Sequence, residues 1–477
     1  MKNIYRLILL AGLFPANAFA NPTTEHLDPA GPIICWVTLI FLLGVIGRHL
    51  AQKIKMPGVL GELLMGVLVG NVCYFFCMPL AIVLREGSAI FDIMALVFSG
   101  EPLARAVSTV IPDAHYANQV IVALSGIHGP DLFKVAYVVD IFSRYGVIFL
   151  LFMVGLESSI SDLKHTGRES IQVALIGVVA PILLGLLVTY YLMPNASFQA
   201  DLFVAATLSA TSIGITARVL KDMNKLRTRE AKTILGAAMI DDILGLIILA
   251  IVSSLVINGV IDMLVVSRVI LWAGVFFVGA LFIGPWILRK TIRMFDSFEL
   301  WEAKLFTAFL FLMGLAWLAT LVQLATIIGA FVAGLIIHDS LFDFREREGK
   351  SSVNIQKLMA PLEAILAPLF FMLIGIQVKV ETFFNGQVLL IAAGLIIAAI
   401  VGKLMSGWGA NRKDDRLLIG IGMLPRGEVG LVFASIGRTL GVISDELFAA
   451  IILMVIVTTL IAPPWLTMRY ARKLHDT

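Results

Sequence analysis

The feature that most constrains the fold of this 477-residue chain is a succession of thirteen apolar stretches separated by polar links. An α-helix needs about 20 mostly apolar residues to cross the hydrocarbon core of a bilayer, where its backbone groups must bond to one another. The stretches are 32–50, 59–76, 137–156, 171–193, 200–219, 233–256, 267–288, 305–321, 324–338, 357–377, 386–408, 415–438 and 446–468. They predict an all-α polytopic membrane protein with about 13 transmembrane helices. The long mixed stretch 77–136 leaves room for one or two extracytoplasmic or interfacial helices more.

Composition excludes other classes of protein. Hydrophobic residues make up 59% of the chain and charged residues 14%, against about 45–50% and about 25% in soluble proteins. A soluble multidomain enzyme and a disordered chain are therefore excluded. The net charge of +3 is too balanced to indicate a nucleic-acid partner, and the three cysteines exclude a disulfide scaffold and a multi-cysteine metal cluster. We expect no cofactor.

Charge placement predicts the topology. Lys2 and Arg6 flank the apolar run Leu7–Leu13, and Ala18–Ala20 fits a cleavage site, so residues 1–20 are predicted to be a signal peptide. A retained first membrane helix is the alternative. If the mature chain starts outside, the predicted inner links hold 25 Lys and Arg residues and the outer links five. Because cytoplasmic links are enriched in basic residues, this bias places the C-terminus inside, with no soluble domain after the last span.

Two segment pairs indicate an internal repeat. Leu151–Ile160 resembles Phe371–Val380, and Gly58–Gly66 resembles Thr326–Gly334. The members of each pair lie seven spans apart, an odd number, so they have opposite orientations in the membrane. Inverted repeats are typical of secondary transporters, whose substrate sites lie near the midplane. Similar Gly-rich packing helices are the alternative explanation.

Charged residues inside the spans indicate the site. Asp241 and Asp242 are flanked by apolar sequence on both sides, and an Asp at a helix centre costs about 2.5–3.5 kcal/mol on insertion scales. We interpret them as a proton or cation site, with structural salt bridges as the alternative. Burial and mutual repulsion favour a proton on at least one of them. Lys403 lies at a depth from which it can reach this pair, although it could instead extend to the interface.

Two spans are predicted to be interrupted. Leu208–Thr216 contains four hydroxyl residues and a glycine, and Met423–Gly430 places Pro425, Arg426, Gly427 and Glu428 in mid-span. Broken helices at membrane depth occur where the backbone is buried in protein or lines a cavity. These spans are again seven apart, so the repeat predicts that they cross at its centre. Thr211, Ser212 and freed carbonyls could then coordinate a hard cation, while Arg426 and Glu428 neutralise half-helix ends or pair with buried charges rather than bind substrate.

Four motifs together carry a family resemblance. They are Ala210–Leu220, Gly236–Leu246, Pro368–Gly375 and Pro425–Leu431. The chain resembles bacterial monovalent cation:proton antiporters over residues 32–470, nearest to the NapA-like sodium/proton exchangers with a double-aspartate motif, and this implies the NapA/NhaA-like antiporter fold. The signal-like N-terminus and the stretch 77–136 depart from the simplest family pattern.

The resemblance also implies roles for single residues. Asp242 would be the carboxylate that binds the transported cation, Asp241 would pair with Lys403, and Thr211 and Ser212 would lie in the unwound segment near the ion.

The same resemblance implies a domain organisation. Core helices 137–256 and 357–468 would move against dimerisation or scaffold helices 32–76 and 267–338 in a homodimer surrounded by lipid in the bacterial inner membrane.

We therefore predict a secondary antiporter that exchanges Na⁺ for protons by alternating access, with Li⁺ as the alternative cation. Two adjacent titratable groups suggest an electrogenic exchange of two protons per cation, with electroneutral exchange as the alternative. A K⁺/H⁺ antiporter is the main competing function. An intramembrane aspartyl protease is a remote one, because its two aspartates come from different helices whereas Asp241 and Asp242 are adjacent.

Overall fold

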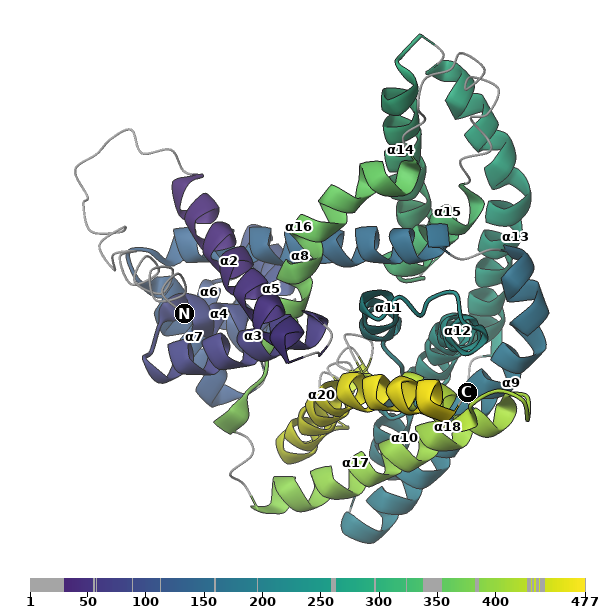
Figure 1. Ribbon diagram of the computed structural model, residues 1–477. Coiled ribbons are helices and arrows are strands. Elements are labelled where there is room, and N and C mark those ends of the chain that lie inside the picture. Colours follow the sequence, from purple (N-terminus) through teal and green to yellow (C-terminus); the bar gives the residue numbers. More distant parts are fainter. Residues whose placement is uncertain are drawn as a thin grey trace. The chain divides into compact units, whose positions relative to one another are not determined.

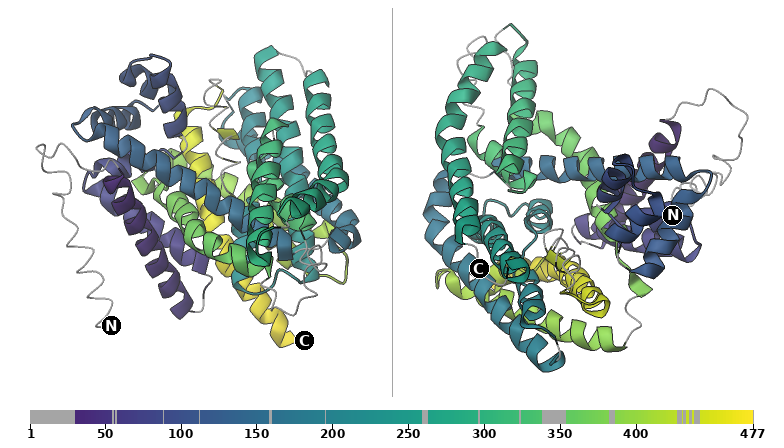
Figure 2. Two further views of the ribbon diagram at one scale, coloured as in Figure 1. Left: turned by 90° about the horizontal axis from the view of Figure 1, so that it is seen from above. Right: turned by 180° about the vertical axis from the view of Figure 1, so that it is seen from behind.

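A computed structural model provides the structure of the chain (Figures 1 and 2). It describes residues 30–476 apart from 55, 57, 88, 112, 158–159, 195, 259–262, 296, 323, 338–353, 382–385, 427–429, 431–432, 435–436 and 438–441. The predicted signal peptide 1–20 and Glu428 lie outside these residues. Within the described ranges all regular structure is helical and no strand occurs, as the apolar pattern predicted.

The helices follow the predicted spans closely. They are α2 (Gly31–Lys53), α3 (Gly58–Phe75), α4 (Pro79–Leu84), α5 (Ala89–Phe98), α6 (Leu103–Val110), α7 (Ala114–Ser125), α8 (Gly129–Glu157), α9 (Ile160–Leu192), α10 (Phe198–Thr207), α11 (Ile213–Asp222), α12 (Arg229–Asn258), α13 (Met263–Met294), α14 (Leu300–Leu321), α15 (Thr326–Ile336), α16 (Ile355–Ile376), α17 (Gly386–Ser406), η4 (Gly407–Gly409), α18 (Arg416–Gly422) and α20 (Asp445–Asp476). In the described part, nine helices are long and apolar enough to cross a membrane. The other four predicted spans correspond to the short helix α15, to α12 and to the two interrupted helices.

The chain divides into two compact units. The first holds the described residues up to Ile54, together with Gly61–Gly146 and Ile365–Lys379. The second holds the described residues between Ile54 and Gly61, then Val147–Ala364 and those from Val380 on. The predicted division into core and dimerisation helices concerns movement, and it stays a prediction.

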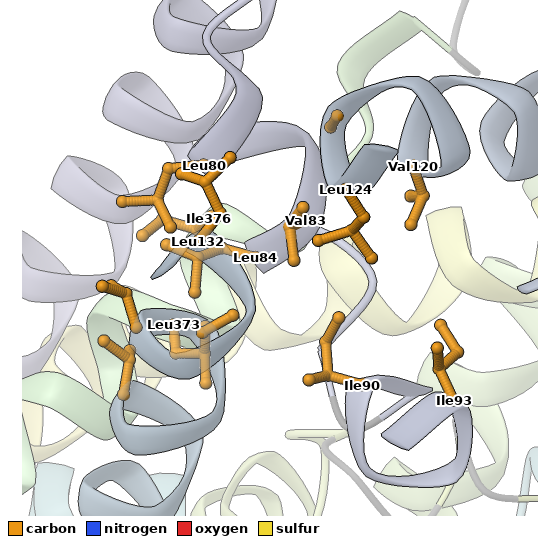
Figure 3. Packing of buried hydrophobic residues seen from close by; sticks show 14 of the residues in the cluster. Leu80, Val83, Leu84, Ile90, Ile93, Val120, Leu124, Leu132, Leu373 and Ile376 are labelled. Carbon is orange, nitrogen blue, oxygen red and sulfur yellow. The ribbon is translucent and has the colours of Figure 1, made fainter. Parts of the chain in front are cut away.

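The first unit contains the unassigned stretch 77–136. Four short helices, α4 to α7, form here before α8 begins, more than the one or two that the sequence suggested. The carboxylate of Asp113 starts α7 by accepting the first-turn backbone N–H groups of His115 and Tyr116. These helices surround a fully apolar core, to which α4, α5, α7, α8 and α16 all contribute side chains, among them Val83 and Ile93 (Figure 3).

The second unit is organised around α9, which packs along both α12 and α17. Gly402 of α17 allows the close approach to α9, because a Cβ at this position would lie 2.7 Å from the nitrogen of Pro181. Side chains from α10, α17 and α20 form the apolar core of this unit, including Phe203, Leu395 and Ile451. This core places the interrupted helices α10–α11 and α18 next to α12 and α17.

Glycine contacts repeat in the two units as the predicted inverted repeat requires. In the first unit, a Cβ on Gly66 of α3 or on Gly375 of α16 would lie 2.3 Å from a backbone oxygen of the other helix. In the second unit, a Cβ on Gly155 of α8 or on Gly334 of α15 would lie 2.3 and 2.2 Å from such an oxygen. The sequence repeat matches Gly66 with Gly334 and Gly155 with Gly375. The repeat thus matches α3 with α15 and α16 with α8. The contact between α3 and α16 in the first unit corresponds to the contact between α15 and α8 in the second.

Candidate functional site

Both predicted interruptions are present. α10 ends at Thr207 and α11 begins at Ile213, and Ser212 between them has an extended backbone. α18 ends at Gly422 and is followed by non-helical residues up to Arg426. The breaks free backbone groups that a continuous helix would satisfy, and they do so in a buried part of the second unit.

The two non-helical segments bind each other. The backbone N–H of Ser212 donates to the carbonyl oxygen of Pro425 at 2.7 Å. The hydroxyl of Thr211 donates to the carbonyl oxygen of Met423 at 3.4 Å. Thr211 and Ser212 are 1% and 3% exposed. The predicted crossing of the interrupted helices is therefore held together by hydrogen bonds between their unwound segments.

Arg426 joins this crossing through its side chain and its backbone. Its Nη1 donates to the carbonyl oxygen of Ala210, which lies in the break between α10 and α11 and therefore has no helical hydrogen bond to make. Its own carbonyl oxygen accepts a 2.5 Å hydrogen bond from the hydroxyl of Thr459 on α20. The buried guanidinium group thus contacts the unwound segment of the other interrupted helix, and its charge-compensating role stays a prediction.

The buried ion pair lies beside the crossing. Nζ of Lys403 on α17 is 3.1 Å from Oδ1 of Asp241 on α12, and the two side chains are 0% and 1% exposed. Lys403 therefore points inward and does not extend to the membrane interface. The interrupted helix α18 packs against both α12, which carries Asp241, and α17, which carries Lys403, so the pair and the crossing lie in the same part of the second unit.

Asp242 follows Asp241 on α12 and is also buried. Successive residues point about 100° apart on a helix, so the two carboxylates face different directions. The hydrogen bond from Lys403 goes to Asp241. Among the residues that the structure describes, the Asp241 Oδ2 and the Ser212 hydroxyl are buried without a hydrogen-bond partner. The site thus offers carboxylate, hydroxyl and carbonyl oxygens, which are the ligands of hard cations.

Two further buried residues of this unit, Thr459 and Glu363, were not predicted from the sequence. Thr459 was hidden because a threonine in an apolar stretch has no distinguishing pattern. Glu363 on α16 is 5% exposed and binds Arg218 of α11 at 2.6 Å. A signal for Glu363 existed, because it is a single carboxylate within the predicted span 357–377, and an ionisable residue in a span indicates function by default.

Comparison with known proteins identifies the family. The model of the sodium/hydrogen exchanger family, transmembrane region, matches residues 37–469. The chain is 37% identical to the high-affinity Na⁺/H⁺ antiporter NhaS3 of Synechocystis, over 96% of this chain and 94% of the relative. It is 32% identical to the Na⁺/H⁺-K⁺ antiporter GerN of Bacillus cereus, over 69% and 83%.

A solved structure shows the same fold. The sodium proton antiporter MjNhaP1 of Methanocaldococcus jannaschii superposes with a TM-score of 0.60 at 19% identity, over 93% of this chain and 98% of that one. The predicted antiporter fold is thereby confirmed. The chain belongs to the sodium/hydrogen exchanger family, and it is a cation:proton antiporter and not an enzyme, as its motifs predicted.

Proposed function

We propose that this antiporter exchanges Na⁺ for protons and that Asp242 is the carboxylate that binds both in turn. The observation that carries the proposal is the arrangement on α12, where Asp241 is hydrogen-bonded to Lys403 and Asp242 is the next residue, turned about 100° away. Asp241 thus has a counter-charge in Lys403, and the family resemblance assigns the exchange of cation and proton to its neighbour Asp242. When the site is open to the predicted cytoplasmic side, Asp242 releases its proton and binds Na⁺.

The unwound segments supply further ligands. Thr211 and Ser212 lie in the segment that is hydrogen-bonded to Pro425, and the breaks leave carbonyl oxygens without helical partners. A dehydrated Na⁺ needs several oxygen ligands at once, which a regular helix cannot offer. After the core helices shift and the cation leaves on the other side, protons occupy the carboxylates and allow the return. Because cation and proton compete for one group, exchange is obligatory.

The choice of Na⁺ is supported by the relatives. NhaS3, the more similar of the two compared antiporters, is named for Na⁺/H⁺ exchange, while the name of GerN includes K⁺. K⁺ is therefore the cation to test against Na⁺, with Li⁺ as a third. A screen of the three cations on the purified protein in liposomes ranks them directly.

The Asp242→Asn variant tests the site. It keeps the size of the side chain and removes the charge, so we expect cation-driven proton flux to disappear while the melting temperature stays near that of the wild type. Asp92→Asn, an exposed aspartate of α5, is the matched control and should keep full exchange. Wild-type flux in the Asp242→Asn protein would refute the assignment of this residue.

We also propose that exchange moves two protons per cation. If cation entry draws Asp241 away from Lys403, the buried lysine loses its counter-charge and releases a second proton. Each cycle then carries one net charge inward, which is driven by about 2.3 kcal/mol per 100 mV. The balance point of exchange in liposomes should shift with clamped voltage. A balance point that ignores voltage and follows a one-to-one gradient ratio would establish electroneutral exchange instead.

The remaining expectations concern assembly and location. The family resemblance supports a homodimer in the bacterial inner membrane, with the C-terminus on the cytoplasmic side and helices 32–76 and 267–338 as the scaffold. Cross-linking in native membranes tests the dimer, and labelling of a cysteine introduced near the C-terminus from either side of the membrane tests the orientation.

A further inference from the structure

A second group of buried charges lies at the end of α11 that is remote from the crossing. Nη1 of Arg218 is 2.6 Å from Oε1 of Glu363 on α16, and Nζ of Lys221 is 2.5 Å from its Oε2. Nε of Arg218 also binds Oδ1 of Asp222 at 3.0 Å. Glu363 thus uses both carboxylate oxygens to hold two basic side chains of one short helix.

Helix geometry shows that these contacts fall on one side of α11. Arg218, Lys221 and Asp222 are spaced i, i+3 and i+4, so they share a face. Thr216, two residues before Arg218, points about 200° away around the axis. Its hydroxyl donates at 2.8 Å to the carbonyl oxygen of Gly422, at the end of α18. The short helix is therefore clamped between α16 on one side and the second interrupted helix on the other.

The clamp bears on the position of the cation ligands. α11 has only ten residues, and Ser212 directly precedes its first residue. Arg218 is six residues from Ser212, which is about 9 Å along the axis. A helix this short moves as a rigid piece, so a shift or rotation at the Glu363 end changes the place of Thr211 and Ser212.

We propose that Glu363 is a positioning residue for the cation site. By holding the basic face of α11, it fixes where Thr211 and Ser212 meet the segment that follows α18. The inference rests on the proposed function, since it takes these two residues to be cation ligands. Glu363 itself acts only through α11.

The test uses Glu363→Gln in the full-length protein, with two measurements. The first is the apparent KM for Na⁺ in liposome exchange. The second is the Na⁺ concentration that gives half of the maximal thermal stabilisation in detergent, which reports binding without transport. Loss of an outer partner of metal ligands typically weakens affinity about 10–100-fold. We expect both values to rise about tenfold or more, and the maximal rate to change much less.

Glu62→Gln is the matched control. Glu62 is a fully buried carboxylate that binds Nε of Arg48 at 2.5 Å, but it lies in the first unit, on α3. A merely structural loss would lower the melting temperature of both variants and leave both Na⁺ values unchanged. Should Glu363→Gln fail to fold, Glu363→Asp keeps the charge on a shorter side chain and should show a smaller rise.

The outcomes separate the two proposals. A folded Glu363 variant with the Na⁺ dependence of the wild type overturns the positioning role while leaving the proposed function intact. A wild-type protein that shows neither Na⁺-driven exchange nor stabilisation by Na⁺ refutes the proposed function, and the positioning role with it.

Discussion

The ion pair between Lys403 and Asp241 leads to the sharpest prediction about stability. Both side chains are fully buried, and 3.1 Å separates Nζ from Oδ1, so neither charge has water to replace its partner. Removing one member of a buried pair costs about 3–5 kcal/mol, mostly because the other charge stays behind uncompensated. Lys403→Met leaves the buried Asp241 without its hydrogen-bonded counter-charge, so we expect a loss of about 3 kcal/mol.

The second mutation should then restore stability. Asp241→Asn in the Lys403→Met background removes the uncompensated charge, and we expect it to recover most of the lost stability. Thermal unfolding of the four proteins in one detergent gives the double-mutant cycle, whose coupling should exceed about 1 kcal/mol. If the two single effects simply add, the pair contributes no interaction, and the reading of Lys403 as the counter-charge of Asp241 is wrong.

Two further predictions concern packing and pH. Gly155→Ala places a methyl group 2.3 Å from the Phe331 carbonyl oxygen, so it should lower the melting temperature despite the better helix propensity of alanine, whereas Gly314→Ala, which meets nothing within 4 Å, should not. Burial raises the pKa of Asp414, in the link before α18, more than Arg229 lowers it. Its ionised form is therefore disfavoured in the folded protein. The wild type should lose stability relative to Asp414→Asn as the pH rises through this pKa, which melting temperatures of both proteins from pH 4 to 8 would show. A difference between the two melting temperatures that stays constant over this range would contradict the prediction.

The helices were predictable where one physical rule decides. Spans of about 20 apolar residues have few alternatives to a membrane helix, and the breaks at Ser212 and after Gly422 followed from residues that a membrane helix tolerates poorly. The stretch 77–136 escaped because α4 to α7 have only 6 to 12 residues each. Helices this short cannot be recognised by the length of about 20 apolar residues that identifies a membrane span. They are stabilised by the shared apolar core around Val83 and Ile93.

The sequence predicted which residue types form the site better than it predicted which of them contact one another. The depth of Lys403 in its span was enough to place it within reach of the aspartate pair, and the family resemblance named Asp241 as its partner. The bonds from Arg426 to Ala210 and from Thr459 to Arg426 were not, because they join residues that no local pattern connects. Arg218 looked like one of many basic residues at the inner membrane edge, and only the fold shows that Glu363, 145 residues away, holds it.

The buried charges at the crossing explain why exchange is coupled. The charged side chains described there are Asp241, Asp242, Lys403 and Arg426, and with both carboxylates ionised their formal charges cancel. One Na⁺, or one proton on Asp242, brings the formal charge of these side chains to +1, and both together bring it to +2. Each further uncompensated buried charge costs about 4 kcal/mol, which corresponds to roughly a thousandfold lower occupancy. The form that holds both is therefore disfavoured relative to the forms that hold one, and electrostatic repulsion suppresses a leak that carries cation and proton together.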